Sequence, residues 1–360
     1  MVSLAETIMQ SHTATFKCEV LDPFRSVIAE LDISGGRIQT DTNNNNRTTG
    51  RLTIADPDLA LNTADVNELL HPLSGNFIRP YRQGVLQGTL LVTSYNIRED
   101  TENLSIDVSL SDYSHRLGRQ RFTEKFQIEI GDYYTDAIKA VIQDVDSEAR
   151  FIFPELIYLT PNLTFDSSTS NRWDACVDMA ESFGHKLYYD ERGVVVLKRE
   201  PNPDRQSVVW KFEPNEFNIM TQASKQLDDT DVYNVVVVSG ENTDNEEPVV
   251  YVAEDDDPNS PTYINGPLGR IPDYISSQYV TSVEQAEELA YARLRQVAGV
   301  PEDVTIECVP HPGLRADDLV EVRTEAGKID GKYLVESTTL PMEPGGTMSL
   351  SLKTKRVLNG

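Results

Sequence analysis

Residues 327–352 read GKIDGKYLVESTTLPMEPGGTMSLSL, and residues 84–110 read GVLQGTLLVTSYNIREDTENLSIDVSL. The two segments share a pattern at a constant offset of 243 residues, which relates Gly88 to Gly331. The positions that match without a gap are Gly84, Leu86, Gly88, Leu91, Val92, Ser94 and Ile97 in the first segment and Gly327, Ile329, Gly331, Leu334, Val335, Ser337 and Leu340 in the second. After a shift of one residue the later strand matches too, with Ile106, Val108 and Leu110 corresponding to Met348, Leu350 and Leu352.

Each segment has the pattern of a strand, a turn and a second strand, because apolar and polar residues alternate in two runs around a polar stretch. An alternating strand buries only one face, so each hairpin needs further strands to close a core, as in a small barrel. Similarity at a fixed spacing favours a duplicated β-barrel domain. The alternative is a pair of unrelated hairpins that share glycine and valine by chance.

Length, composition and charge narrow the class of protein. A chain of 360 residues suits about two or three domains, and 39% hydrophobic residues are enough for folded cores. The formal net charge of −26 argues against binding to free nucleic acid or to anionic membranes, since both require basic surfaces. No stretch approaches the roughly 18 apolar residues of a membrane span, and residues 1–18 lack a signal-peptide pattern. We therefore expect a soluble product made in the cytoplasm.

The first third of the chain is rich in predicted strands and is expected to form a first β-barrel domain, residues 1–120. A short helix is expected over residues 4–11, and the segment DTNNNN at residues 41–46 is expected to be a polar loop. The expected strands cover residues 15–20, 26–31, 36–39 and 47–54 and the repeat region 77–110, with breaks at 22–23 and 34–36.

A small α+β domain, residues 121–204, is expected to follow. Asp132 can cap one amphipathic helix and Ser170 a second, which Gly184 would end. A hairpin over residues 186–198 comes next, and the segment PNPD at residues 201–204 has the composition of a linker.

The remaining residues are expected to form a second β-barrel domain from residues 205–240 and 301–360. Its expected strands cover residues 208–212, 232–239, 304–309 and 319–323, followed by the second copy of the repeat. An inserted segment, residues 241–300, carries an acidic loop and the longest helix signal in the chain, Thr281 to Ala298, with Thr281 and Glu284 as a capping box. The predicted fold class is thus α+β and predominantly β.

The sequence contains no recognisable catalytic or metal-binding motif. Cys18, Cys176 and Cys308 are far apart and are interpreted as buried small hydrophobes. The five histidines, His12, His71, His115, His185 and His311, form no zinc-binding pair and are interpreted as surface or hydrogen-bonded residues. We assign no catalytic, cofactor-binding or metal-binding residue, expect no cofactor, and do not expect an enzyme.

Two polar segments could be mistaken for cation sites. The spacing of Asp41, Asn43 and Asn45 imitates the start of a calcium loop, but Asn46 stands where the loop needs glycine and Leu52 where it needs glutamate. The acidic run Glu254 to Asp257 fits no known loop and is interpreted as a solvated tip.

The order of these parts resembles that of bacteriophage tail hub proteins, the baseplate-hub and tail-associated proteins of long-tailed phages of the siphophage type. The resemblance rests on SNRWDACVDMAESFGHKLYYDERGVVVLK, VYNVVVVSG, TSVEQAEELAYARLRQ and LRADDLVEVRTEAGKIDGKYLVESTTL. The opening, from HTATFKCEVLDP to NNNNRTTGRLTIAD, is similar to minor tail proteins of phages that infect actinobacteria.

The resemblance implies a homotrimer in which two similar barrels per chain make a pseudo-sixfold ring at the tail tip of the virion, assembled in the host cytoplasm. The implied partners are the tail tube or distal tail protein, the tape measure protein and tip or fibre proteins. DNA would only pass through the channel, for which an acidic lumen is suited, and no stable membrane association is implied.

Two other functions remain open on the sequence. One is a receptor-binding tail adhesin whose polar loops, DTNNNN and residues 241–257, contact host surface carbohydrate. The other is a cell-wall hydrolase, since a pair of catalytic carboxylates is defined by its separation in space and not by a motif.

Overall fold

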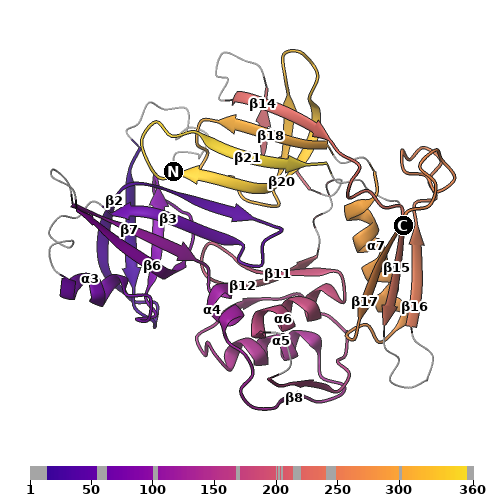
Figure 1. The fold of residues 1–360 in the computed structure, drawn as a ribbon, viewed down its shortest axis with the longest axis horizontal. Coiled ribbons are helices and arrows are strands. Elements are labelled where there is room, and N and C mark those ends of the chain that lie inside the picture. Colours follow the sequence, from indigo (N-terminus) through magenta and orange to yellow (C-terminus); the bar gives the residue numbers. More distant parts are fainter. Residues whose placement is uncertain are drawn as a thin grey trace.

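The computed structural model describes residues 14–54, 63–99, 104–167, 171–199, 201, 203, 206–213, 220–240, 249–299 and 302–354. The protein is predominantly β, as predicted, and most of its strands belong to one large sheet (Figure 1). The helix expected over residues 4–11 lies outside the described residues. Among the residues that are described, no helix is long and apolar enough to cross a membrane.

The first part of the chain forms a closed barrel, drawn in indigo and purple in Figure 1. The strands pair in the order β1-β4-β6-β7-β3-β2, and β2 returns to pair with β1. The short strand β5 pairs with β4, and the helix α3 places Val66 and Leu70 in the barrel core. The elements are β1 (Phe16–Leu21), β2 (Val27–Asp41), β3 (Thr48–Ile54), α3 (Thr63–Leu70), β4 (Phe77–Arg82), β5 (Val85–Leu86), β6 (Leu90–Glu99) and β7 (Leu104–Ser111).

The prediction of two strands, 26–31 and 36–39, was wrong, because β2 is one continuous strand. The glycines that suggested a break between two strands allow a bulge and a close approach to β3 instead. Pairing with β3 shifts between Ile33 and Gly35, and Gly36 has a φ of +121°. A Cβ on Gly36 would lie 2.1 Å from the carbonyl oxygen of Arg51, so only glycine fits here.

The last part of the chain forms a second set of strands with the same neighbour order, β13-β19-β20-β21-β18-β14. It differs from the first in that β13 runs parallel to β19, whereas β1 runs antiparallel to β4. No pairing closes β14 onto β13 within the described residues. The strands are β13 (Trp210–Phe212), β14 (Met220–Leu227), β18 (Glu302–Cys308), β19 (Leu319–Arg323), β20 (Asp330–Pro341) and β21 (Met348–Lys353).

The repeat found in the sequence recurs in the strand pairing. Val92 in β6 faces Leu110 in β7, and Val335 in β20 faces Leu352 in β21. A bulge follows Val92 in the first pair and Val335 in the second. The 243-residue offset therefore relates β6 to β20, and the one-residue shift relates β7 to β21, in the pairing of the strands.

In the sequence, an α+β unit comes between the two sets of strands. It has its own core, in which the helices α5 and α6 pack together. The strands β11, β12 and β9 form one small sheet, and β8 and β10 form another. The elements are α4 (Ser114–Arg119), β8 (Phe126–Ile128), α5 (Tyr134–Gln143), β9 (Phe151–Ile152), β10 (Leu163–Phe165), α6 (Arg172–Glu181), β11 (His185–Tyr189) and β12 (Val195–Arg199).

The predicted helix caps in this unit were displaced by one residue. Tyr133 and not Asp132 precedes α5, and it makes no side-chain cap. Asn171 caps α6 by accepting a hydrogen bond from the Asp174 backbone N–H, while Ser170 lies outside the described residues. Neighbouring polar residues compete for a cap, and the pattern alone does not decide between them.

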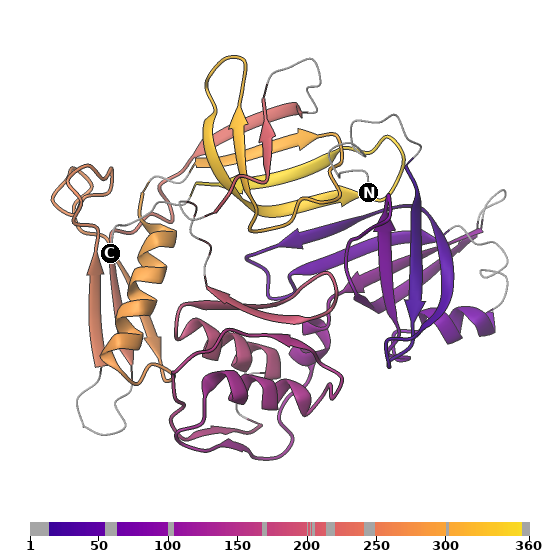
Figure 2. The same cartoon turned by 180° about the vertical axis from the view of Figure 1, so that it is seen from behind.

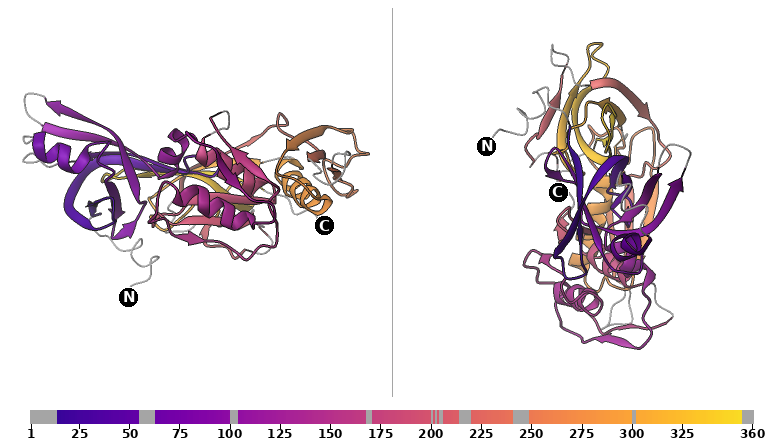
Figure 3. Two further views of the ribbon diagram at one scale, coloured as in Figure 1. Left: turned by 90° about the horizontal axis from the view of Figure 1, so that it is seen from below. Right: turned by 90° about the vertical axis from the view of Figure 1, so that its left-hand side faces the viewer.

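A fourth unit stands at one end of the molecule (Figure 3) and contains α7, the longest of the described helices. The strands pair in the order β16-β15-β17, and α7 covers one face of this sheet. The elements are β15 (Val235–Gly240), β16 (Val249–Glu254), β17 (Pro272–Ser277) and α7 (Val283–Val297).

The sequence analysis placed the strand at residues 232–239 in the second barrel, and this was wrong. Both edges of β15 are taken, by β16 antiparallel and by β17 parallel, so it belongs to the inserted unit. The capping box of α7 is also corrected: it is formed by Ser282 and Gln285 instead of Thr281 and Glu284.

Candidate assembly interfaces

The two sets of barrel strands are joined edge to edge. The last residues of β2 pair antiparallel with the last residues of β20, from Arg37 opposite Pro341 to Asp41 opposite Ser337. Ile38 and Leu340 face each other in this joint, and each is only 3% exposed. The joint makes a single sheet of both barrels (Figure 2), so the main-chain hydrogen bonds that fix one barrel to the other are those of a β-ladder.

Polar contacts beside the ladder strengthen this joint. The Thr42 N–H donates to the Glu336 carbonyl oxygen at 3.0 Å, and the Asn43 side-chain amide donates to Glu336 Oε1 at 2.7 Å. Arg47 donates to Asp317 Oδ2 at 2.9 Å and lies 3.8 Å above the ring of Tyr188. Arg47 therefore touches the second barrel and the α+β unit at once.

Two further arginines from opposite barrels cross the joint with their guanidinium groups. Arg82 donates to the Pro341 carbonyl oxygen at 2.5 Å, and burial lowers the pKa of its guanidinium to about 10. Arg315 donates to the Leu86 and Pro312 carbonyl oxygens at 2.9 and 2.7 Å, and burial lowers its pKa too. Buried arginines that donate to backbone carbonyls fix loops in place, and this is their role here.

Asp112 anchors the start of the α+β unit against the first barrel. Its carboxylate accepts hydrogen bonds from the Thr48 N–H at 2.7 Å, the Ser114 N–H at 3.1 Å and the Ser114 hydroxyl. Only 2% of the residue is exposed, and burial raises the pKa of the carboxyl to about 6. A buried acid that accepts backbone hydrogen bonds is a structural anchor.

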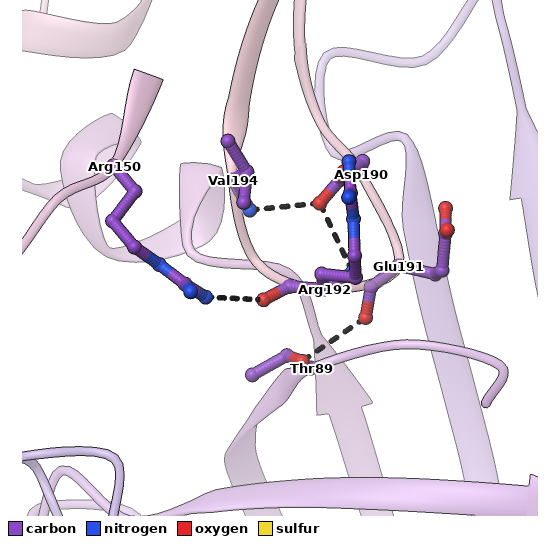
Figure 4. Close-up of polar contacts among 6 residues, drawn as sticks. All are labelled: Thr89, Arg150, Asp190, Glu191, Arg192 and Val194. Atoms are coloured by element: carbon purple, nitrogen blue, oxygen red, sulfur yellow. Dashed lines mark hydrogen bonds and ion pairs between the residues drawn. The ribbon is translucent and has the colours of Figure 1, made fainter. Parts of the chain in front are cut away.

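The turn between β11 and β12 brings the α+β unit against the first barrel (Figure 4). Asp190 Oδ1 accepts from the backbone N–H groups of Arg192 and Val194 at 3.0 and 2.8 Å, which closes the turn. The Thr89 hydroxyl then donates to the Glu191 carbonyl oxygen at 3.0 Å. Gly193 has a φ of +71° and packs on the Thr89 side chain, so the turn fits closely against the barrel.

The α+β unit also contacts the inserted unit. The Tyr134 hydroxyl donates to the Tyr279 carbonyl oxygen at 2.6 Å, and Glu288 of α7 pairs with Arg199 and accepts from the Tyr158 hydroxyl. Burial raises the pKa of the Tyr134 hydroxyl.

A cleft of about 780 Å³ lies beside these contacts, between α6 and β11 on one side and β17 and α7 on the other. An ion pair between Arg293 and Asp273, at 2.7 Å, lines it. Sequence reasoning did not find this cleft, because its walls are more than 80 residues apart in the chain.

The DTNNNN loop makes contacts within the chain. The Asn43 N–H donates to Asp41 Oδ1 at 2.9 Å, the Trp173 indole N–H donates to the Asn45 carbonyl oxygen at 3.0 Å, and the Asn45 amide donates to Asp174 at 3.2 Å. The loop thus connects the first barrel to α6.

The acidic run differs from the predicted solvated tip at one residue. Asp255 is 1% exposed and accepts hydrogen bonds from the hydroxyls of Ser260 and Thr262, while Glu254 pairs with Arg270. These partners remove Asp255 from solvent, and Asp256 alone in the run is exposed. Residues 241–248 of the predicted acidic loop lie outside the described residues.

The three cysteines are buried, as predicted, and burial raises the pKa of the Cys18 and Cys308 thiols to about 12. His185 Nδ1 lies 2.8 Å from the Phe183 carbonyl oxygen. His311 is buried against Trp210, and burial lowers its pKa to about 4. No group of three or more His, Cys, Asp or Glu that could hold a metal ion occurs in the described ranges, and His12 lies outside them.

Solved structures of tail proteins share this arrangement over nearly their whole length. A tail protein from Neisseria meningitidis MC58 superposes with a TM-score of 0.68 at 14% identity, covering 94% of this chain and 97% of that one. The chain has the fold of a phage tail protein. The 43 kDa tail protein of prophage MuSo2 from Shewanella oneidensis gives a TM-score of 0.64 at 13% identity, over 95% and 98% of the two chains.

Prophage tail protein gp18 from Listeria monocytogenes EGD-e has the same tail-protein fold, with a TM-score of 0.57, 13% identity and 95% coverage of each chain. A family described as YQBQ-like matches residues 176–353. No curated protein matches this chain. The resemblance to tail proteins that the sequence suggested is thus confirmed at the level of fold.

Proposed function

We propose that this protein is a structural hub of a phage tail tip and that it acts without catalysis. The observation that carries the proposal is the duplication: two sets of strands share one neighbour order and one bulge position, and a β-ladder joins them edge to edge. Two similar barrels joined by a β-ladder suit the matching of a sixfold partner to a threefold one.

In the proposed assembly, the chain forms a trimer. Three chains with two similar barrels each present six near-equivalent surfaces, which suits a hexameric tail tube or distal tail ring on one side and threefold tip proteins on the other. The barrel pair in this proposal consists of the strands β1 to β7 and of the strands β13, β14 and β18 to β21. The α+β unit, from α4 to β12, packs against them.

The proposal places the ring in the virion at the tail tip, around the channel for DNA, with the tape measure protein as a further partner. The net charge of −26 supports transit of DNA and not its retention, because a negatively charged wall repels the phosphate backbone. A structure with a basic channel lining would contradict this part.

The contacts of the DTNNNN loop do not support the alternative of a receptor-binding adhesin. The side-chain amides of Asn43 and Asn45 donate to Glu336 and Asp174 of the same chain, so they are engaged in fixing the loop. The hub therefore remains the better proposal.

Mass measurement of the purified chain, alone and mixed with the tail-tube or distal tail protein of the same phage, tests the proposal. A trimer, alone or formed on addition of the partner, is the expected result, and images of the complex should show threefold or sixfold symmetry around the protein. A stable monomer that ignores both partners and binds whole host cells would favour the adhesin, and clearing of cell walls in a zymogram would favour the hydrolase.

A further inference from the structure

Within the described residues, one edge of β6 in the first barrel has no paired strand at the position where the corresponding edge of β20 in the second barrel pairs with β2. In β20, pairing with β19 ends at Leu334, and the residues from Ser337 to Pro341 pair with β2. In β6, pairing with β4 involves only Leu90 and Leu91. By the 243-residue offset, residues 94–98 of β6 correspond to 337–341, and within the described chain no strand occupies that edge.

The second barrel has the complementary open edge, in β14. In the second barrel β14 has the position that β2 has in the first, and the strand pairing shows which residues correspond. Gly36 of β2 pairs with Leu52 of β3, and Ala223 of β14 pairs with Ile306 of β18. Leu52 and Ile306 in turn face Val108 and Leu350, which are matching positions of the repeat.

Residues 224–227 at the end of β14, with Asp228 directly after it, therefore correspond to residues 37–41 of β2, the segment that forms the joint with β20. Among the described residues, β14 pairs with β18 alone. The described part of the chain thus has two open strand edges, one on β6 that corresponds to the paired edge of β20 and one on β14 that corresponds to the paired edge of β2.

Exposed apolar side chains mark both open edges. Leu227 on β14 is 58% exposed and Ile97 on β6 is 36% exposed, whereas Leu340, the counterpart of Ile97, is 3% exposed inside the joint. If the open edges paired as the filled ones do, Leu227 would lie opposite Tyr95 and on the same face as Ile97. Such burial supplies a driving force that the isolated chain does not use.

Resting on the proposed trimer, we infer that the last residues of β14 pair antiparallel with the last residues of β6 in a second copy of this chain, in the register of the β2–β20 joint. Gln226 then lies opposite Asn96 of the second copy, as Gln39 lies opposite Thr339 within one chain. Each chain offers one β14 edge and one β6 edge, so the contact is head to tail and continues until a ring closes.

Cysteine cross-linking in the assembled protein tests this register. Two chains are prepared, one with Gln226→Cys and one with Asn96→Cys, each on the solvent-facing side of its strand. Under mild oxidation the mixture should give a disulfide-linked dimer of unlike chains, and neither chain alone should cross-link. One chain carrying both substitutions should give a covalently closed trimer on a non-reducing gel. The three native cysteines are buried, so they contribute little background.

A pair of controls fixes the register. Gln226→Cys with Ile97→Cys places the two thiols on opposite faces of the ladder and should not cross-link. Asp228→Cys with Ser94→Cys, two residues along on the same face, should cross-link as well and guards against a local defect in the first pair. Each variant is first shown to melt at the temperature of the parent chain.

The outcomes separate the inference from the proposed function. An oligomer by mass that lacks both cross-links overturns the β14–β6 contact and leaves the hub in place. Cross-linking of the Asn96→Cys chain with itself indicates a twofold contact and also overturns it. A chain that stays monomeric with and without its tail partner, and does not cross-link, counts against both.

Discussion

Val92 and Val335, 243 residues apart, stand immediately before the same bulge in two separate strand pairs. A bulge bends a strand and changes the direction in which its later residues run. In β20 the residues after Val335 leave β19 and pair with β2. The bulge therefore explains how β20 directs its last residues to β2, while its first residues pair with β19.

Replacement of Leu340 should destabilise the protein far more than replacement of Ile97, which has the same position in the first barrel. Leu340→Ala removes a side chain that is 3% exposed, belongs to the core of the second set of strands and lies opposite Ile38 in the joint, and it should lower the free energy of unfolding by about 2–5 kcal/mol. Ile97→Ala is the matched control, at the same position of the repeat but exposed, and should cost within about 0.5 kcal/mol in dilute solution. Urea unfolding of the two variants measures this, and equal costs would contradict the difference in burial between Leu340 and Ile97.

Gly36 should tolerate no side chain, while its neighbour should. Gly36→Ala places a Cβ 2.1 Å from the Arg51 carbonyl oxygen at a φ of +121°, so the ladder must shift, and a loss of more than about 2 kcal/mol is expected. Gly35→Ala places its Cβ 3.5 Å from a Glu343 side-chain oxygen, an ordinary contact, and should be nearly neutral. Thermal melting of both variants tests this, and a neutral Gly36→Ala would contradict the close approach of β2 to β3.

The same glycines show where sequence reasoning reached its limit. The pattern of strands and the repeat could be predicted, since alternation and spacing are local properties of the chain. Ser34, Gly35 and Gly36 were interpreted as a break between two strands. Glycine permits both a break and a bulge, and only the position of Arg51 on the neighbouring strand decides between them.

The membership of strands in sheets was harder to predict than the strands themselves. The run of valines in β15 suits any buried strand, and its assignment to the inserted unit depends on β16 and β17, which the sequence analysis did not identify. The joint was likewise invisible, because an edge strand that accepts a partner has the same composition as any other. Arg47 and Arg82 could not be identified as joint residues from the sequence either, because their partners in the second barrel are far away in the chain.

The contact between the α+β unit and the inserted unit should depend on one buried hydroxyl. Tyr134→Phe removes the donor to the Tyr279 carbonyl oxygen and leaves that oxygen without this partner, which should cost about 1–3 kcal/mol. Tyr133→Phe, one residue earlier, changes a side chain that is 48% exposed and should stay within about 0.5 kcal/mol. Hydrogen exchange of α7 should also rise in the Tyr134 variant alone; unchanged exchange there would mean that the two units are held by other contacts.

Asp112 should make stability depend on pH in the acid range. Its pKa is about 6 in the folded protein, and the unfolded value is about 3.9, so between these values the folded state binds more protons than the unfolded state. The contribution of this group to the free energy of unfolding therefore falls as pH rises from about 4 to 6 and is constant above that window. The cause is burial, which disfavours the ionised carboxylate in the folded protein and so raises the pKa of Asp112.

Asp112→Asn removes the titration, so the stability of the parent relative to this variant should fall between pH 4 and 6, by at most about 3 kcal/mol. Ser114→Ala is the control: it removes the hydroxyl that donates to the same carboxylate but keeps the titrating group, so its pH dependence should remain at least as steep as that of the parent. Urea unfolding of the three proteins at closely spaced pH values gives the comparison. A difference between parent and Asp112→Asn that does not change over this window would show that Asp112 ionises in the fold as readily as in the unfolded chain, and that burial does not control its charge.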